Sequence, residues 1–123
     1  MTKNTTLTEF EECKLLVEYL ELKKIKFTHL AQSTFTKSWA TKTKNRQLGV
    51  RAGFPDYAII FDYPSVKKKA LVFLEMKRTK GGVVSDEQKV WLEDLNDCNG
   101  VSAYIAKGFD EAKEIVDKFN GES

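Results

Sequence analysis

Two short groups of residues carry side chains that can do chemistry. The sequence GFPD (53–56) stands directly before an apolar run at residues 57–61, and EMK (75–77) closes a second apolar run that begins at residue 70. Runs of this composition favour β-strands, and the segment DYPSVKKK between them predicts a hairpin turn. The carboxylates of Asp56 and Glu75 and the ammonium of Lys77 therefore belong to one predicted hairpin.

The register of this hairpin decides whether the two carboxylates meet. If the turn centres on Ser65-Val66, Asp56 lies opposite Glu75, and directly opposed side chains have Cβ atoms about 4.5–5.5 Å apart. Lys77 lies two residues beyond Glu75 and so projects from the same face of the sheet. A register shifted by one residue would break the pairing. We therefore predict two carboxylates and one ammonium on a single face.

This group of side chains suits hydrolysis of a phosphodiester. Two close carboxylates repel each other unless a cation lies between them. Asp56, Glu75 and the backbone carbonyl of Met76 offer the hard oxygen ligands that Mg²⁺ prefers, with Mn²⁺ as a substitute. Such a metal would polarise the phosphate and lower the pKa of a water molecule. Lys77 would orient or deprotonate the attacking water, and the products would carry a 3′ hydroxyl and a 5′ phosphate.

Simpler interpretations exist for the same residues. Asp56 after Pro55 is also typical of a turn, and Glu75 with Lys77 would make an exposed charge pair of little value to stability. Against that, the run ALVFLEM (70–76) is apolar at nearly every position, which predicts a buried strand in which unpaired charge is costly. The pattern as a whole favours a functional site.

The elements that must position this site follow from apolar periodicity and capping signals. Thr8 precedes three glutamates and predicts the start of an amphipathic helix, and Ser85 with Gln88 predicts a capping box. The expected elements are a helix at 8–23, a strand at 25–30, a basic loop to Gly53, strands at 57–61 and 70–76, a helix from Ser85 to about Asn96, a strand at 101–106 and a helix at about 110–119. This order, α-β-β-β-α-β-α, predicts an α/β domain over residues 1–123, with a mixed β-sheet flanked by helices and a parallel strand pair across the 70–106 unit.

Charge is distributed unevenly behind the net value of +2. Residues 22–55 contain eight bases and no acid, and residues 67–80 contain six bases against Glu75 alone, whereas residues 85–123 contain ten acids against four lysines. Clustered bases are the footprint of a polyanion site, although a solvated loop has a similar composition. The aromatic residues Phe35 and Trp39 lie among the bases and would stack on nucleobases or pack inward. The predicted nucleic-acid contacts are Lys37, Lys44, Arg46, Arg51, Arg78 and Lys80.

Composition excludes several classes of protein. A charged fraction of 31% with 11% aromatic residues is ordinary for a folded domain. No apolar run reaches the roughly 18–20 residues of a membrane span, and the first twelve residues lack the apolar segment of a signal peptide. Cys13 and Cys98, with His29 as the one histidine, cannot fill a four-ligand zinc site. We expect an intracellular protein with reduced thiols and no membrane partner.

These motifs together resemble a known family. E-x-K alone is a weak motif, but G-x-P-D before one strand, E-x-K on the next, a Gly-Gly pair at 81–82, and then Ser85, Gln88 and Trp91 in a helix form a specific combination. The combination resembles the VRR-NUC (virus-type replication-repair nuclease) group of the PD-(D/E)XK phosphodiesterase superfamily, over about residues 8 to 116. The resemblance implies a restriction-endonuclease-like core, metal binding by Asp56 and Glu75, and catalysis by Lys77.

Further expectations come from the resemblance alone. A glutamate of the first helix often completes the site, with Glu12 as the first candidate and Glu9 as the second, although both also suit the helix dipole. Gln88 matches a glutamine that faces the active site, and it also suits the capping box. The short stand-alone members of the group are phage or bacterial proteins that resemble symmetric dimers cutting branched DNA.

The resemblance thus implies a Mg²⁺-dependent, homodimeric endonuclease that cleaves branched DNA such as four-way (Holliday) junctions. It would act in DNA repair or recombination, in the cytoplasm of a bacterium or a phage-infected host. Two alternatives stay open. One is a DNA-binding module without catalysis, and the other is a PD-(D/E)XK nuclease of different polarity, such as an exonuclease or a restriction-type enzyme.

Overall fold

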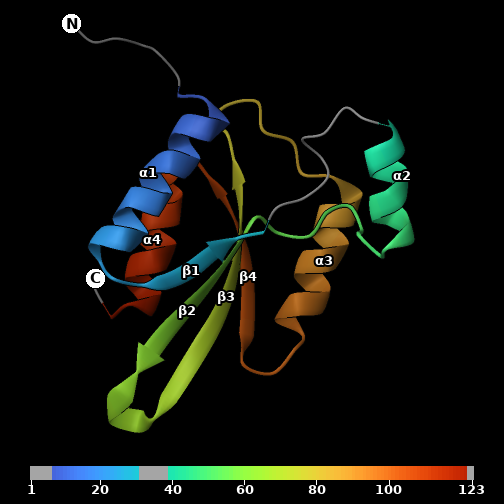
Figure 1. Ribbon diagram of the computed structural model, residues 1–123. Helices are drawn as coiled ribbons and strands as arrows, with labels where there is room; N and C mark the ends of the chain where they lie inside the picture. Colours follow the sequence, from blue (N-terminus) through green and yellow to red (C-terminus); the bar gives the residue numbers. More distant parts are fainter. Residues whose placement is uncertain (1–6, 31–38, 122–123) are drawn as a thin grey trace, which may run out of the picture.

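A computed structural model describes residues 7–30 and 39–121 of the chain. In order, its elements are α1 (Glu9–Leu22), β1 (Lys26–His29), α2 (Trp39–Gln47), β2 (Tyr57–Tyr63), the 3₁₀ turn η2 (Pro64–Val66), β3 (Lys68–Lys77), α3 (Asp86–Asn96), β4 (Val101–Lys107) and α4 (Phe109–Phe119). The strands form a single layer with helices on both sides (Figure 1). Within the described ranges, no helix combines the length and the apolar character that crossing a membrane requires.

The four strands form one mixed sheet in the order β1-β2-β3-β4. β1 pairs with β2 and β2 with β3 in antiparallel fashion, whereas β3 and β4 are parallel and are joined through α3. Across the hairpin, Tyr57 pairs with Leu74 and Tyr63 with Lys68, which is the register predicted from the turn. The predicted fold class, a mixed sheet flanked by helices, is confirmed.

The two faces of the sheet have different roles. α1 and α4 lie together over one face (Figure 1), and alternate residues of β2 and β3 pack against them. The buried residues of this core are Leu16, Leu20, Ile25, Tyr57, Ile59, Phe61, Val72, Leu74, Met76, Ala106, Ala112 and Val116. Because side chains alternate along a strand, the intervening residues Phe73, Glu75 and Lys77 point to the other face, where α3 lies. The chemistry-bearing residues thus occupy the face opposite the main core.

The segment expected to be a basic loop differs from the prediction, because it contains the helix α2. None of the residues of α2 is buried, so the helix has no apolar face and leaves no apolar period in the sequence. Its end is marked by Gly49, whose φ of 99° suits a helix C-terminus, and Val50 N–H donates to the Asn45 carbonyl at 2.9 Å. Local hydrogen bonding rather than core packing therefore defines this element.

Candidate active site

Gly53 begins the segment that delivers Asp56, and only glycine fits there. Its φ is +94°, and a Cβ at this position would lie 2.8 Å from Glu87 and 2.9 Å from the backbone nitrogen of Gln88. Glycine adopts this φ without strain, and its bare Cα lets the chain approach the first turn of α3. The glycine of the G-x-P-D motif therefore brings this segment against the helix that carries Gln88.

Phe54 fixes the same segment through its ring. It packs edge-to-face against Phe73 of β3, at 5.2 Å between ring centroids, and against Trp91 of α3, at 4.9 Å. The Trp91 indole also donates to the Ala52 carbonyl at 3.0 Å. Edge-to-face pairs of this kind contribute about 0.5–1.5 kcal/mol each beyond buried area. The start of β2 is thereby held between β3 and α3.

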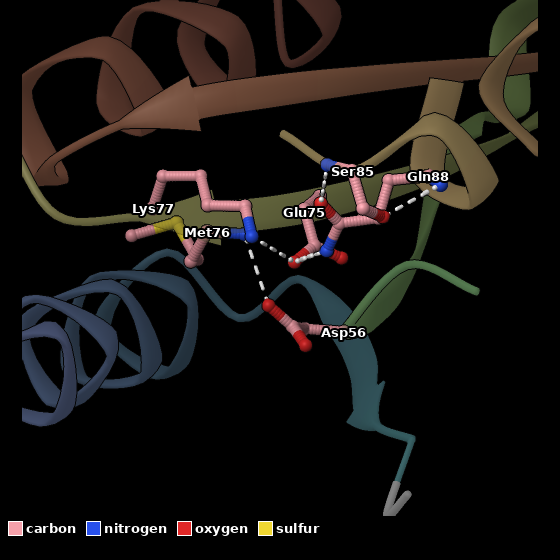
Figure 2. A network of polar contacts seen from close by, with 6 residues as sticks. All are labelled: Asp56, Glu75, Met76, Lys77, Ser85 and Gln88. Carbon is pink, nitrogen blue, oxygen red and sulfur yellow. Dashed lines mark hydrogen bonds and ion pairs between the residues drawn. The ribbon is translucent and has the colours of Figure 1, made fainter. Parts of the chain in front are cut away.

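Asp56 reaches across to β3 at the end of the hairpin. Its Oδ2 accepts a hydrogen bond from the backbone N–H of Met76 at 3.0 Å (Figure 2). Burial raises the pKa of Asp56 above its ordinary value, and the Met76 N–H opposes this rise. The contact continues the observed register past Tyr57, so the structure brings Asp56 beside Glu75 as the sequence predicted.

Glu75 is a buried carboxylate, with 4% of its surface exposed. Its Oε2 accepts from Gln88 Nε2 at 2.8 Å and lies 3.5 Å from the Lys77 ammonium (Figure 2). Its Oε1 is also buried, and no hydrogen-bond partner for it lies among the described residues. Burial, followed by the charge of Asp56, raises the pKa of Glu75 from 4.5 to about 8, while Lys77 acts in the opposite direction.

Gln88 belongs to the capping box of α3 and also contacts Glu75. Its Oε1 accepts from the backbone N–H of Ser85 at 2.9 Å, and its backbone N–H donates to Ser85 Oγ at 3.1 Å, so the predicted capping box is confirmed. The Nε2 of the same side chain donates to Glu75 Oε2 (Figure 2). The start of α3 thus orients the Glu75 carboxylate.

The two glutamates of α1 have different surroundings. Glu12 is 5% exposed, and its oxygens accept from Thr79 Oγ1 at 2.6 Å and from the Phe109 N–H at 2.7 Å. Both oxygens of Glu12 are therefore engaged, one by Thr79 just after β3 and the other by the first residue of α4. Glu9 lies one turn earlier, and burial followed by the negative charge of Asp56 raises its pKa. The charge of Glu9 therefore acts on both members of the carboxylate pair.

Thr79 and Gly108 belong to this arrangement and carry no signal in the sequence. Gly108 N–H donates to the Lys77 carbonyl at 2.9 Å, which ties the end of β3 to the start of α4. A Cβ on Gly108 would lie 2.3 Å from Thr79 Oγ1 and 3.1 Å from Glu12, and the φ of Gly108 is +89°. The backbone of Lys77 is thus held by the same junction that binds Glu12.

The predicted basic contacts fall at separate places. Lys44 and Arg46 are exposed on α2, and Arg51 is exposed behind it, with its guanidinium donating to the Arg46 and Val50 carbonyls. Arg78 directly follows β3, and its positive charge acts on Glu9. Lys80 is exposed near the start of α4. Lys37 lies outside the described residues.

The carboxylate pair fits a divalent cation. The described part of the chain contains no group of three or more His, Cys, Asp or Glu side chains arranged to hold a metal, so any ion here would rest on two side chains and on backbone oxygen or water. The buried, unpartnered Oε1 of Glu75 is an open oxygen ligand, and the mutual repulsion with Asp56 is relieved by a cation. Hard ions such as Mg²⁺ accept few protein oxygens and keep several waters.

The mixed sheet thus places Asp56 beside the Glu75-x-Lys77 end of β3. A family model described as the VRR-NUC domain matches residues 7–110, and the chain belongs to this family. The VRR-NUC domain is a nuclease domain of the PD-(D/E)XK type, so the protein is a nuclease with DNA as its substrate. The predicted family is confirmed.

Comparison with solved structures supports the fold. A chain titled "VRR_NUC domain protein" is similar, with a TM-score of 0.72 and 23% sequence identity over 94% of this chain and 89% of that chain. A comparison with curated proteins gives no match.

Proposed function

We propose that this nuclease is a Mg²⁺-dependent endonuclease that hydrolyses phosphodiester bonds in branched DNA, such as four-way junctions. The observation that carries the proposal is the buried Glu75 carboxylate, with one unpartnered oxygen beside Asp56 and with the Lys77 ammonium 3.5 Å from the other oxygen. A buried charge cluster of this kind is costly to the fold, which favours a role in chemistry over one in stability.

Asp56, Glu75 and the Met76 carbonyl would hold Mg²⁺, with Mn²⁺ as a substitute. When bound, the ion supplies Lewis acidity at the phosphate and lowers the pKa of a water molecule. The Lys77 ammonium orients the attacking water and balances negative charge that develops on the phosphate. Gln88 fixes the rotamer of Glu75 through its amide and so acts as a positioning residue.

Glu9 is the better candidate for the acid that completes the site. Its charge interacts with Asp56 and Lys77, whereas both oxygens of Glu12 are hydrogen-bonded at the junction of α1 and α4. In this assignment Glu12, the first candidate from the sequence, positions the backbone of Lys77 through Phe109 and Gly108.

The substrate and the assembly follow from charge and symmetry. The exposed bases Lys44, Arg46, Arg51, Arg78 and Lys80, together with Lys37, supply phosphate contacts. Residues 1–123 form one nuclease domain, and two copies related by a two-fold axis would set two sites against the two strands of a symmetric junction. The setting is intracellular, in a bacterium or a phage-infected host.

The test compares a labelled four-way junction with a linear duplex of the same sequence, in Mg²⁺, Mn²⁺ or EDTA. We expect metal-dependent cutting of the junction that is lost in Lys77→Ala and kept in Lys69→Ala. Lys69 is the matched control because it lies on the same strand, with its side chain 64% exposed and paired with Asp62. Junction binding without cutting would establish the DNA-binding module instead. Stepwise shortening from DNA ends would establish an exonuclease, and equal cutting of the linear duplex a restriction-type enzyme.

A further inference from the structure

α2 exposes an aromatic side chain that the carboxylate site does not use. Trp39, its first residue, is 80% exposed. An exposed tryptophan is unusual because its large ring gains free energy when it leaves water. The other tryptophan of the chain, Trp91, instead packs against Phe54 and donates to Ala52. The ring of Trp39 is therefore available to bind a partner that would remove it from water.

Two basic side chains follow Trp39 on one face of the helix. Lys42 and Arg46 follow at helical spacings of three and seven residues, which places all three on one side. They line a shallow hollow of about 350 Å³ together with Thr43 and Gln47. Residues 22–55 contain no acidic residue, so no carboxylate of this segment offsets the charge. An aromatic ring beside two cations complements a nucleobase with its adjoining phosphates.

The chain connects this hollow directly to the active site. Gln47 ends α2 nine residues before Asp56, a span of at most about 30 Å. The connecting segment is fixed against α3 by the bond from Trp91 to Ala52 and by the close approach of Gly53 to the first turn of α3. One helical turn of duplex DNA, about 34 Å, covers such a distance. The distance between the two places is therefore within the length of one DNA molecule.

We infer that Trp39 is a stacking platform for a nucleobase with an open face at a DNA branch point, with Lys42 and Arg46 bound to the adjoining phosphates. Inside a continuous duplex, both faces of every base are covered by neighbouring bases. A branch point exposes base faces, so stacking on Trp39 distinguishes branched from unbroken DNA. The inference rests on the proposed function and names the contact through which that site selects its substrate.

The test uses tryptophan fluorescence in EDTA, where DNA binds without being cut. In Trp91→Phe, Trp39 is the one tryptophan left. We expect a four-way junction to quench its emission strongly at saturation, and a linear duplex with hairpin-closed ends to leave it nearly unchanged. If loss of the Trp91 bond to Ala52 impairs folding, the difference between the wild type and Trp39→Phe isolates the same signal.

Affinity measured by fluorescence anisotropy provides the second readout. Trp39→Ala should weaken junction binding about 5- to 150-fold, the range for loss of one stacked base, while Trp39→Phe keeps most of the affinity. Leu48→Ala is the matched control, because Leu48 is an apolar side chain 83% exposed directly after α2, and it should change affinity less than twofold.

Three results would overturn the inference. Full junction binding with unchanged Trp39 emission would show that no base stacks on Trp39, and so would wild-type affinity in Trp39→Ala. Neither result would contradict the proposed nuclease function. Absence of any DNA binding by the wild type would instead overturn the proposed function, and the inference with it.

Discussion

Replacement of Glu75 by glutamine should stabilise the metal-free protein relative to the wild type, and this difference should increase as the pH rises. Burial and then the charge of Asp56 raise the pKa of Glu75 from 4.5 to about 8. A group whose pKa is raised by folding favours the folded state fully below its unfolded pKa, and this contribution is lost as the pH rises through the folded pKa. The amide of Glu75→Gln is isosteric with the protonated carboxyl and does not titrate, so the variant escapes this loss.

The size of the effect follows from the two pKa values. One pKa unit corresponds to about 1.4 kcal/mol, so ionisation of Glu75 between pH 5.5 and 8.5 would cost the folded wild type about 3 kcal/mol as an upper bound. Because the effective dielectric constant is about 20 even at buried sites, we expect the actual cost to be about 1–2 kcal/mol. For a domain of this size, such a difference corresponds to roughly 5 °C in Tm.

Thermal unfolding in EDTA at pH 5.5 and pH 8.5 provides the assay. We expect the Tm advantage of Glu75→Gln over the wild type to grow by roughly 5 °C between the two pH values. Glu93→Gln, which replaces an exposed carboxylate on α3, should show no such pH dependence. A Tm advantage that is the same at both pH values, or a variant that is less stable than the wild type at pH 8.5, would refute the view that the ionised Glu75 destabilises the metal-free fold.

Three further predictions concern the site and its supports. Gly53→Ala should lower both the rate of cleavage and the stability of the fold. Measured by urea unfolding, it should lower the free energy of unfolding by about 1–3 kcal/mol more than Gly49→Ala does. Gly49 has a similar positive φ but open space around its Cα, so an equal effect would contradict the close approach to α3. Glu12→Ala should lower the free energy of unfolding by about 2–3 kcal/mol, because buried donors lose their acceptor. Glu9→Gln should lower cleavage with little change in unfolding; the reverse pattern would exchange the two assignments.

The hairpin was predictable because its determinants are local. The apolar runs, the turn after Tyr63 and the alternation of side chains fix the pairing of Tyr57 with Leu74, and with it the meeting of Asp56 and Glu75. The helix α2 was not predictable from periodicity, because a helix with no buried face leaves no apolar pattern. Local signals thus defined the sheet and the center of the site, but not every helix.

The choice between Glu9 and Glu12 depends on contacts far apart in the chain. Both glutamates lie on the first turns of α1, three residues apart, so helical spacing places them close to one face. Glu12 differs from Glu9 in its hydrogen bonds to Thr79, 67 residues away, and to Phe109, 97 residues away. These bonds join α1 to the residues after β3 and to the start of α4, and a single sequence does not indicate them.

The central claim is that Asp56 and Glu75 form a divalent-cation site for DNA cleavage. Titration with Mn²⁺, followed by electron paramagnetic resonance and by cleavage of the four-way junction on the same samples, tests it most directly. We predict Mn²⁺ binding by the wild type that is lost or greatly weakened in Asp56→Asn and in Glu75→Gln, with cleavage lost in parallel. Undiminished Mn²⁺ binding in both variants, or metal-dependent cleavage that survives either substitution, would contradict the claim.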